Sequence, residues 1–104
     1  MYEKLIWLEG KTLNTLDQHR HFTVLQVTRS AVIIRVHSTN RERVILMSGI
    51  EAAWNKLAST GTITAVEILN QPNRCSAYIC TMLSMLNGVS YSIRPIVLRY
   101  RQNM

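Results

Sequence analysis

The residues of this chain that could do chemistry are mostly arginines. Its 104 residues include nine arginines and three lysines against six acids, for a net charge of +6. Residues 53–104 hold five basic residues and one acid (net +4), whereas residues 1–52 hold seven and five (net +2). A guanidinium group offers a planar fork of donors that matches the oxygens of a phosphate. This composition favours a nucleic-acid partner.

One group of arginines falls on two predicted strands in the first half of the chain. Arg35 alternates with apolar residues, and Arg41 and Arg43 share one face of the following strand. If the two strands pair across a turn at 38–40, we expect these three side chains to form one basic sheet face that contacts phosphates. The alternative is a solvated outer face whose charge is partly neutralised by Glu42.

A second group of basic residues lies in the C-terminal half. Arg94, Arg99 and Arg101 form a basic strip on the predicted terminal strand, and Lys56 lies on a predicted helix. We expect these four side chains to hold phosphates. Both groups offer arginines and hydroxyls but few exposed aromatic rings, which favours contact with a duplex backbone over stacking on single-stranded bases. We expect the partner to be DNA more than RNA.

Catalytic and metal-binding patterns do not accompany these basic residues. His19, His21 and His37 have no acid or cysteine at recognisable metal-ligand spacing. Cys80 falls near an apolar helix face, where a thiol is inert. The six acids show no pairing suited to acid–base work. We therefore expect a protein that is not an enzyme and that needs no metal or cofactor.

The apolar segments are too short for a membrane protein. No run approaches the ~20 residues that span a bilayer. The run at Leu5–Leu8 is too short for a signal peptide and is flanked by Glu3 and Glu9. We expect a cytoplasmic protein without a membrane partner. Because only 17% of the residues are charged, a low fraction, a protein partner or a homodimer could cover part of the surface.

The elements that must position the arginines begin with a β-rich segment, residues 1–47. Its first 21 residues are the least legible: Leu5 to Leu8 could form a strand, and Leu13 and Leu16 could share a helical turn. Alternating and β-branched residues then predict a three-stranded antiparallel meander at 22–28, 31–37 and 41–46.

Helical patterns follow. The first helix is expected at about 48–60, with a capping box at Ser48-Gly-Ile-Glu51 and a left-handed end at Gly61. A second capping box, Thr64-Ala-Val-Glu67, opens a short helix.

The third helix is expected to start at a capping Asn73 and to end at Asn87-Gly88. Its outer positions would be Ser, Thr and Met. Segments 89–94 and 96–100 are β-like, and Pro95 between them marks an edge, a bulge or a tight turn. The predicted apolar stripe of the third helix consists of Tyr78, Ile79, Met82, Leu83 and Leu86.

This order of elements resembles the winged helix-turn-helix family. Leu57 to Gly61, followed by Ile63-Thr64-x-x-Glu67-Ile68, is similar to the junction of the first two helices in that family. The segment from Ser76 to Val89 is similar to the helix that such proteins lay in the major groove. The resemblance covers about 50 of the 104 residues. It implies DNA binding and transcription regulation, with Arg74 and Ser76 near the bases.

The third helix departs from that family in its charge. Between Arg74 and Asn87 its only ionisable side chains are those of Cys and Tyr, whereas phosphate neutralisation dominates the affinity of DNA-binding proteins. The alternatives are that this helix is buried on most sides or that it forms a dimer face.

The sequence thus predicts one α+β domain over residues 1–104, mostly β to residue 47 and helix-turn-helix-like from residue 48, with a terminal strand or hairpin. The function it favours is duplex DNA binding through arginine–phosphate contacts. The alternative is a protein-interaction module or small regulator with a winged-helix-like surface. In that case Met82 and Met85 would supply an adaptable apolar contact.

Overall fold

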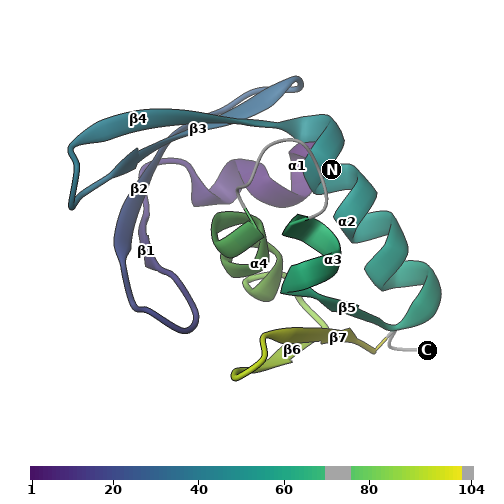
Figure 1. Cartoon of the computed structure of the whole chain (residues 1–104). Coiled ribbons are helices and arrows are strands. Elements are labelled where there is room, and N and C mark those ends of the chain that lie inside the picture. The colour runs from purple at the N-terminus through teal and green to yellow at the C-terminus, as the bar shows by residue number, and fades with distance from the viewer. Residues whose placement is uncertain (70–75, 102–104) are drawn as a thin grey trace.

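A computed structural model of the chain describes residues 1–69 and 76–101. Within these residues the fold is α+β, with a four-stranded antiparallel sheet, four α-helices and a second sheet of three short strands. The larger sheet curves over one side of the helices, and the smaller sheet lies at the opposite end (Figure 1). The predicted α+β class is confirmed.

The chain starts with a helix, α1 (Tyr2–Leu5), that continues into a 3₁₀ turn, η1 (Ile6–Leu8). Leu5 and Leu8 are both buried, and a spacing of three places two side chains on one face of a helix. The predicted strand at Leu5–Leu8 is therefore wrong.

The larger sheet consists of β1 (Thr12–Asn14), β2 (His21–Val27), β3 (Ala31–Val36) and β4 (Arg41–Leu46), in that order. The strands β2 to β4 match the predicted meander. The strand β1 adds a fourth member and places Leu13 opposite Phe22, so the helical turn predicted to join Leu13 to Leu16 is wrong. On the inner face of the sheet, Phe22, Val24 and Ile34 are fully buried against the helices.

The helix α2 (Met47–Thr60) follows β4 without a loop. The helix is amphipathic: Ile50, Ala53 and Leu57 on its inner side are fully buried. Gly61 ends it with φ of 83°, and its N–H donates to the carbonyl oxygen of Leu57. The predicted capping box at Ser48–Glu51 is wrong, because the helix already begins at Met47 and no side chain caps it.

A second unit of helices and strands follows Gly61. It consists of β5 (Thr62–Thr64), α3 (Ala65–Leu69), α4 (Ser76–Ser84), β6 (Val89–Ser92) and β7 (Val97–Tyr100). The three strands form an antiparallel sheet in the order β5-β7-β6. The predicted cap of the short helix is present, since the Glu67 N–H donates to the Thr64 hydroxyl over 3.3 Å. The predicted cap at Asn73 lies outside the described residues.

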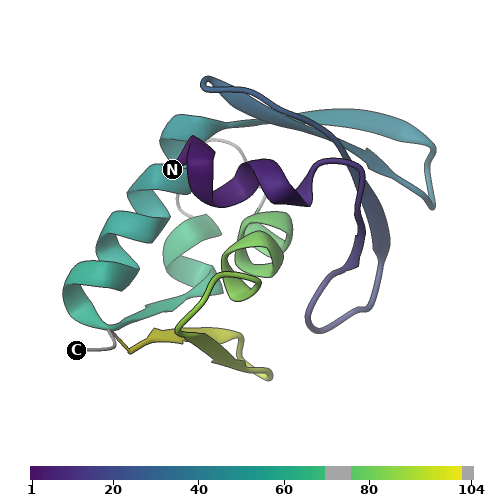
Figure 2. The same ribbon diagram turned by 180° about the vertical axis from the view of Figure 1, so that it is seen from behind.

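The helix α4 is the centre of the molecule. Every side chain from Tyr78 to Leu83 is at most 9% exposed. The Phe22 ring of β2 packs edge-on against Tyr78, with ring centroids 5.1 Å apart. In both views the larger sheet lies on one side of α4 and α2 on the other, while the N-terminal segment lies above it (Figures 1 and 2).

This burial decides between the alternatives for the third helix. Burial on most sides is confirmed. The predicted exposure of threonine is wrong, because Thr81 is 2% exposed and its hydroxyl donates to the carbonyl oxygen of Ala77 over 2.8 Å. Met82 is fully buried and Met85 is exposed, so the two do not form one surface contact. None of the helices within residues 1–69 and 76–101 is long and apolar enough to cross a bilayer.

Candidate nucleic-acid interface

The acidic side chains divide the cations of this chain into two classes. All six acids lie in the described residues, and four of them form ion pairs. Asp17 pairs with Arg94 at 3.6 Å, and Glu67 pairs with Lys56. Among the described residues, five arginines have no side-chain carboxylate within 4 Å: Arg20, Arg41, Arg43, Arg99 and Arg101. We call these the unpaired arginines.

The register of β3 and β4 separates the arginines that the sequence placed together. Val36 lies opposite Arg41, and Arg35 lies opposite Glu42. Because directly opposed residues share a face of an antiparallel sheet, Arg35 is on the outer face, whereas Arg41 and Arg43 are on the inner face. The prediction of one basic sheet face is therefore wrong.

The outer-face arginine is neutralised. The guanidinium of Arg35 lies 3.6 Å from the Glu42 carboxylate, and both side chains are about half exposed (48% and 58%). The alternative from the sequence, partial pairing with Glu42, is confirmed. A surface pair of this kind contributes little stability, but it leaves Arg35 less available for a phosphate.

On the inner face, Arg43 reaches toward the start of α4. Its guanidinium carbon lies 5.7 Å from the centre of the Tyr78 ring, a cation–π contact. Arg20 approaches the same region from the loop that joins β1 to β2. Both side chains line a pocket of about 250 Å³ that we call the arginine pocket. Its lining residues are Thr15, Leu16, Asp17, Gln18, Arg20, Arg43, Ala77, Tyr78 and Ile96.

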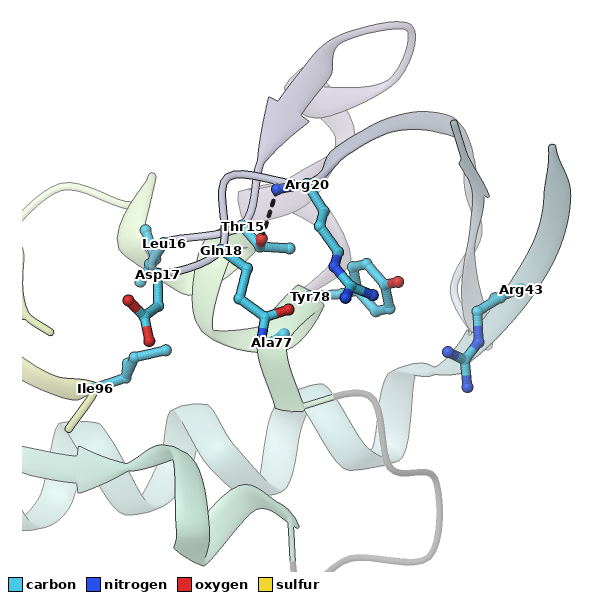
Figure 3. Close-up of a pocket in the computed structure, with 9 residues that line it drawn as sticks. All are labelled: Thr15, Leu16, Asp17, Gln18, Arg20, Arg43, Ala77, Tyr78 and Ile96. Atoms are coloured by element: carbon cyan, nitrogen blue, oxygen red, sulfur yellow. Dashed lines mark hydrogen bonds between the residues drawn. The ribbon is translucent and has the colours of Figure 1, made fainter. Parts of the chain in front are cut away.

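The loop that carries Arg20 is held by hydrogen bonds to one residue. The Arg20 N–H donates to the Thr15 hydroxyl over 2.9 Å, and the Thr15 N–H donates to the Arg20 carbonyl oxygen over 3.0 Å (Figure 3). Thr15 is 4% exposed, and the adjacent Leu16 is 9% exposed. Since the loop is anchored in the core, the backbone of Arg20 is fixed before any ligand arrives.

Two more unpaired arginines lie on the small sheet. Arg99 lies opposite Thr62 on one side and Ser90 on the other, and it donates to the Ser92 hydroxyl over 3.2 Å. Arg101 continues the strand, and its N–H donates to the carbonyl oxygen of Gly88 over 3.0 Å. Both side chains are exposed. They are two of the three arginines of the predicted basic strip, and the small sheet that carries them lies at the far end of the molecule from β4 (Figure 1).

The remaining predicted site residues are not among the unpaired arginines. Lys56 lies on a helix, α2, as predicted, whereas Arg94 lies in the turn between β6 and β7 and not on the terminal strand. Each of the two is engaged by a carboxylate. Ser76 is the half-buried first residue of α4. Arg74 lies outside the described residues. Since the rest of α4 is in the core, only its first turn can meet a ligand.

No protein-family model, curated protein or solved structure matches this chain.

The function of this chain must therefore be argued from its own geometry. Sequence reasoning missed Arg20, Gln18 and Tyr78 as members of a site. Arg20 lies between His19 and His21 in the sequence, and this local cluster of nitrogen donors is the one signal that could have indicated it. The contact between Arg43 and Tyr78 joins positions 35 residues apart in the sequence, and no local sequence pattern predicts such a contact.

The titratable residues outside the arginine clusters are in structural roles. Cys80 is fully buried, and this burial raises the pKa of its thiol to about 12, so it stays protonated at neutral pH. His37 shares a hydrogen bond with the Thr23 hydroxyl, with Nε2 and Oγ1 2.7 Å apart. Within the described part of the chain, no three His, Cys, Asp or Glu residues gather closely enough to hold a metal ion.

Proposed function

We propose that this chain binds nucleic acid, with duplex DNA as the preferred form, and that the unpaired arginines make the contacts with phosphates. The observation that supports this best is the division of charge: four of the six described carboxylates pair with other cations, and five exposed arginines have no carboxylate partner among the described residues. When such a cation binds a phosphate of the backbone, condensed counterions are released, and this release favours binding.

A winged-helix-like arrangement is part of this proposal. The helices α2, α3 and α4 follow one another, with the hairpin β6–β7 after them, and β7 pairs with β5 behind the helices. The hairpin turn at 93–96 occupies the place that a wing would take in the family that the sequence resembles. The four-stranded sheet is an addition that covers α4.

This arrangement favours backbone contact over base reading. A recognition helix must expose one side to enter the major groove, whereas Tyr78 to Leu83 are in the core. Contacts would come instead from β4, the loop at 15–20 and the terminal strand. Backbone contacts position a protein on DNA without selecting a sequence, so we expect weak sequence preference.

A gel-shift titration tests the proposal. The chain is mixed with a random-sequence duplex at about 50 mM and about 200 mM salt. We expect a retarded complex at the lower salt and a weaker one at the higher salt. Absence of any complex at the lower concentration would exclude the proposal.

A protein-interaction role is the second candidate, and one observation favours it. Val44 and Leu46, on the outer face of the edge strand β4, are 58% and 47% exposed. An uncovered edge strand with apolar side chains can pair with another chain. Sedimentation of the protein alone, over a range of concentrations, separates a homodimer from a monomer that awaits a different partner.

A further inference from the structure

The arginine pocket has a charged side and an apolar side. In Figure 3, Arg20, Tyr78 and Arg43 lie on one side, Leu16 and Ile96 lie on the other, and Ala77 lies between them. The carboxylate of Asp17, which also lines the apolar side, pairs with Arg94 at 3.6 Å. The uncompensated charge of the pocket is therefore that of two guanidinium groups at one side.

The volume of the pocket limits the size of its ligand. At about 250 Å³, it lies just below the usual range of about 300–1,000 Å³ for small-molecule sites. One nucleotide has a matching polarity, because it joins an anionic phosphate to a base with apolar faces. A base pair is too large, so a nucleotide that enters must be out of the duplex stack.

We propose that the arginine pocket holds one unpaired nucleotide of a DNA strand. Its phosphate contacts Arg20 and Arg43, and its base lies against Leu16 and Ile96, beside Ala77. This inference rests on the proposed function and deepens it: the other unpaired arginines hold the flanking duplex, and the pocket selects a nucleotide that has left the stack.

The pocket is suited to this selection because it is formed in advance. The hydrogen bonds between Thr15 and Arg20 close the loop on one side, and the buried Tyr78 fixes the other. An already unpaired nucleotide avoids the cost of unstacking and binds more tightly than a paired one.

The test compares two labelled duplexes of the same sequence, one fully paired and one with a single extrahelical 2-aminopurine nucleotide. Fluorescence anisotropy gives the affinity for each duplex, and 2-aminopurine emission reports the environment of the extrahelical base. We expect the wild type to bind the bulged duplex about tenfold more tightly and to change its emission. Equal affinity for the two duplexes would overturn the pocket assignment while leaving nucleic-acid binding intact, whereas binding to neither would remove both proposals.

A pocket-filling variant supplies the control. Ala77 is exposed in the first turn of α4 and lines the pocket, so Ala77→Phe fills the space without altering charge. We expect this variant to lose the preference and the emission change. The matched variant Ala52→Phe, at an exposed position of α2, keeps both. Circular dichroism confirms that each variant is folded, and an Ala77→Phe protein that is folded but keeps the preference would contradict the assignment.

The same titration separates a strand from a free nucleotide. Deoxyadenosine monophosphate is added as a competitor. We expect displacement only at concentrations at least a hundredfold above the dissociation constant of the bulged duplex, because the free nucleotide lacks the flanking contacts. Equal affinities would place the ligand outside nucleic acid and overturn the assignment.

Discussion

The two faces of the four-stranded sheet carry arginines in opposite electrostatic situations. On the outer face, Arg35 lies opposite Glu42 and pairs with it at 3.6 Å. On the inner face, Arg41 and Arg43 have no carboxylate within 4 Å among the described residues, and Arg43 faces Tyr78 beside the arginine pocket.

The difference arises from the alternation of a single strand. In Arg41-Glu42-Arg43, neighbouring side chains point to opposite faces, so the acid goes to one face and both cations go to the other. Two positive charges therefore lie on the inner face of β4 without the neighbouring acid, and under the proposal this face contacts a polyanion.

The largest expected effect tests the assignment of faces itself. Ile45 is fully buried on the inner side of β4, and its neighbour Val44 is 58% exposed on the outer side. We expect Ile45→Ala to lower the free energy of unfolding by about 2–5 kcal/mol and Val44→Ala to lower it by less than about 0.5 kcal/mol. Urea denaturation measures both. Equal losses would mean that the faces are assigned wrongly.

The next effect concerns the inner-face cations. The combined substitution of Arg20, Arg41 and Arg43 by Gln removes three phosphate contacts. We expect the affinity for the bulged duplex to fall about a hundredfold at ~0.1 M salt, and its salt dependence to become shallower by the equivalent of about three phosphate contacts. The control is Arg35→Gln on the outer face, which should change affinity less than about twofold because Glu42 already engages that side chain. If Arg35→Gln is as damaging as the triple variant, pairing does not decide which arginines bind.

A smaller effect is expected at the terminal strand. Arg99→Gln with Arg101→Gln removes two contacts at a site away from the pocket, and we expect about a tenfold loss of affinity. Lys56→Gln is the matched control, since Lys56 is engaged by Glu67. Anisotropy titration measures all of these. An undiminished affinity in the double variant would confine the interface to the inner face.

The smallest effect is on stability and depends on pH. The hydrogen bond from Lys56 lowers the pKa of Glu67, chiefly, and the charge of Lys56 adds to this. A carboxyl group whose pKa is lower when folded stabilises the fold above its unfolded pKa, near 4.5, and loses that contribution as the pH falls through the folded pKa. We expect Glu67→Gln to be slightly less stable than the wild type at pH ~6, with a difference that shrinks as the pH falls below the unfolded pKa near 4.5. A difference that does not shrink at the lower pH would have a cause other than this ion pair.

The sequence predicted the elements of this fold better than their relations. Dense β-branched residues predicted β2, β3 and β4. A helical pattern that ends at Gly61 predicted α2. The strands β1 and β5 were missed because three residues are too few to show an alternation. Helical spacing of Leu5 and Leu8 was misjudged because a single turn has no second repeat to confirm it.

The site was predicted in part. Exposure of Arg99 and Arg101 followed from the alternation of the terminal strand. The separation of Arg35 from Arg41 and Arg43 depended on a register of β3 and β4 that the turn at 37–40 sets, and a shift of one residue reverses every face. The arginine pocket joins a loop, a strand edge and a helix start that are distant in sequence, so only the fold brings them together.

The most direct test of the central claim is the salt dependence of duplex binding by the wild-type chain. The logarithm of the association constant for a duplex with a single extrahelical nucleotide is measured against the logarithm of the salt concentration. If the five unpaired arginines are the interface, the association constant should fall with a slope between about −3 and −5, near −0.9 for each phosphate contact. A slope near zero, or no binding at about 50 mM salt, would contradict it.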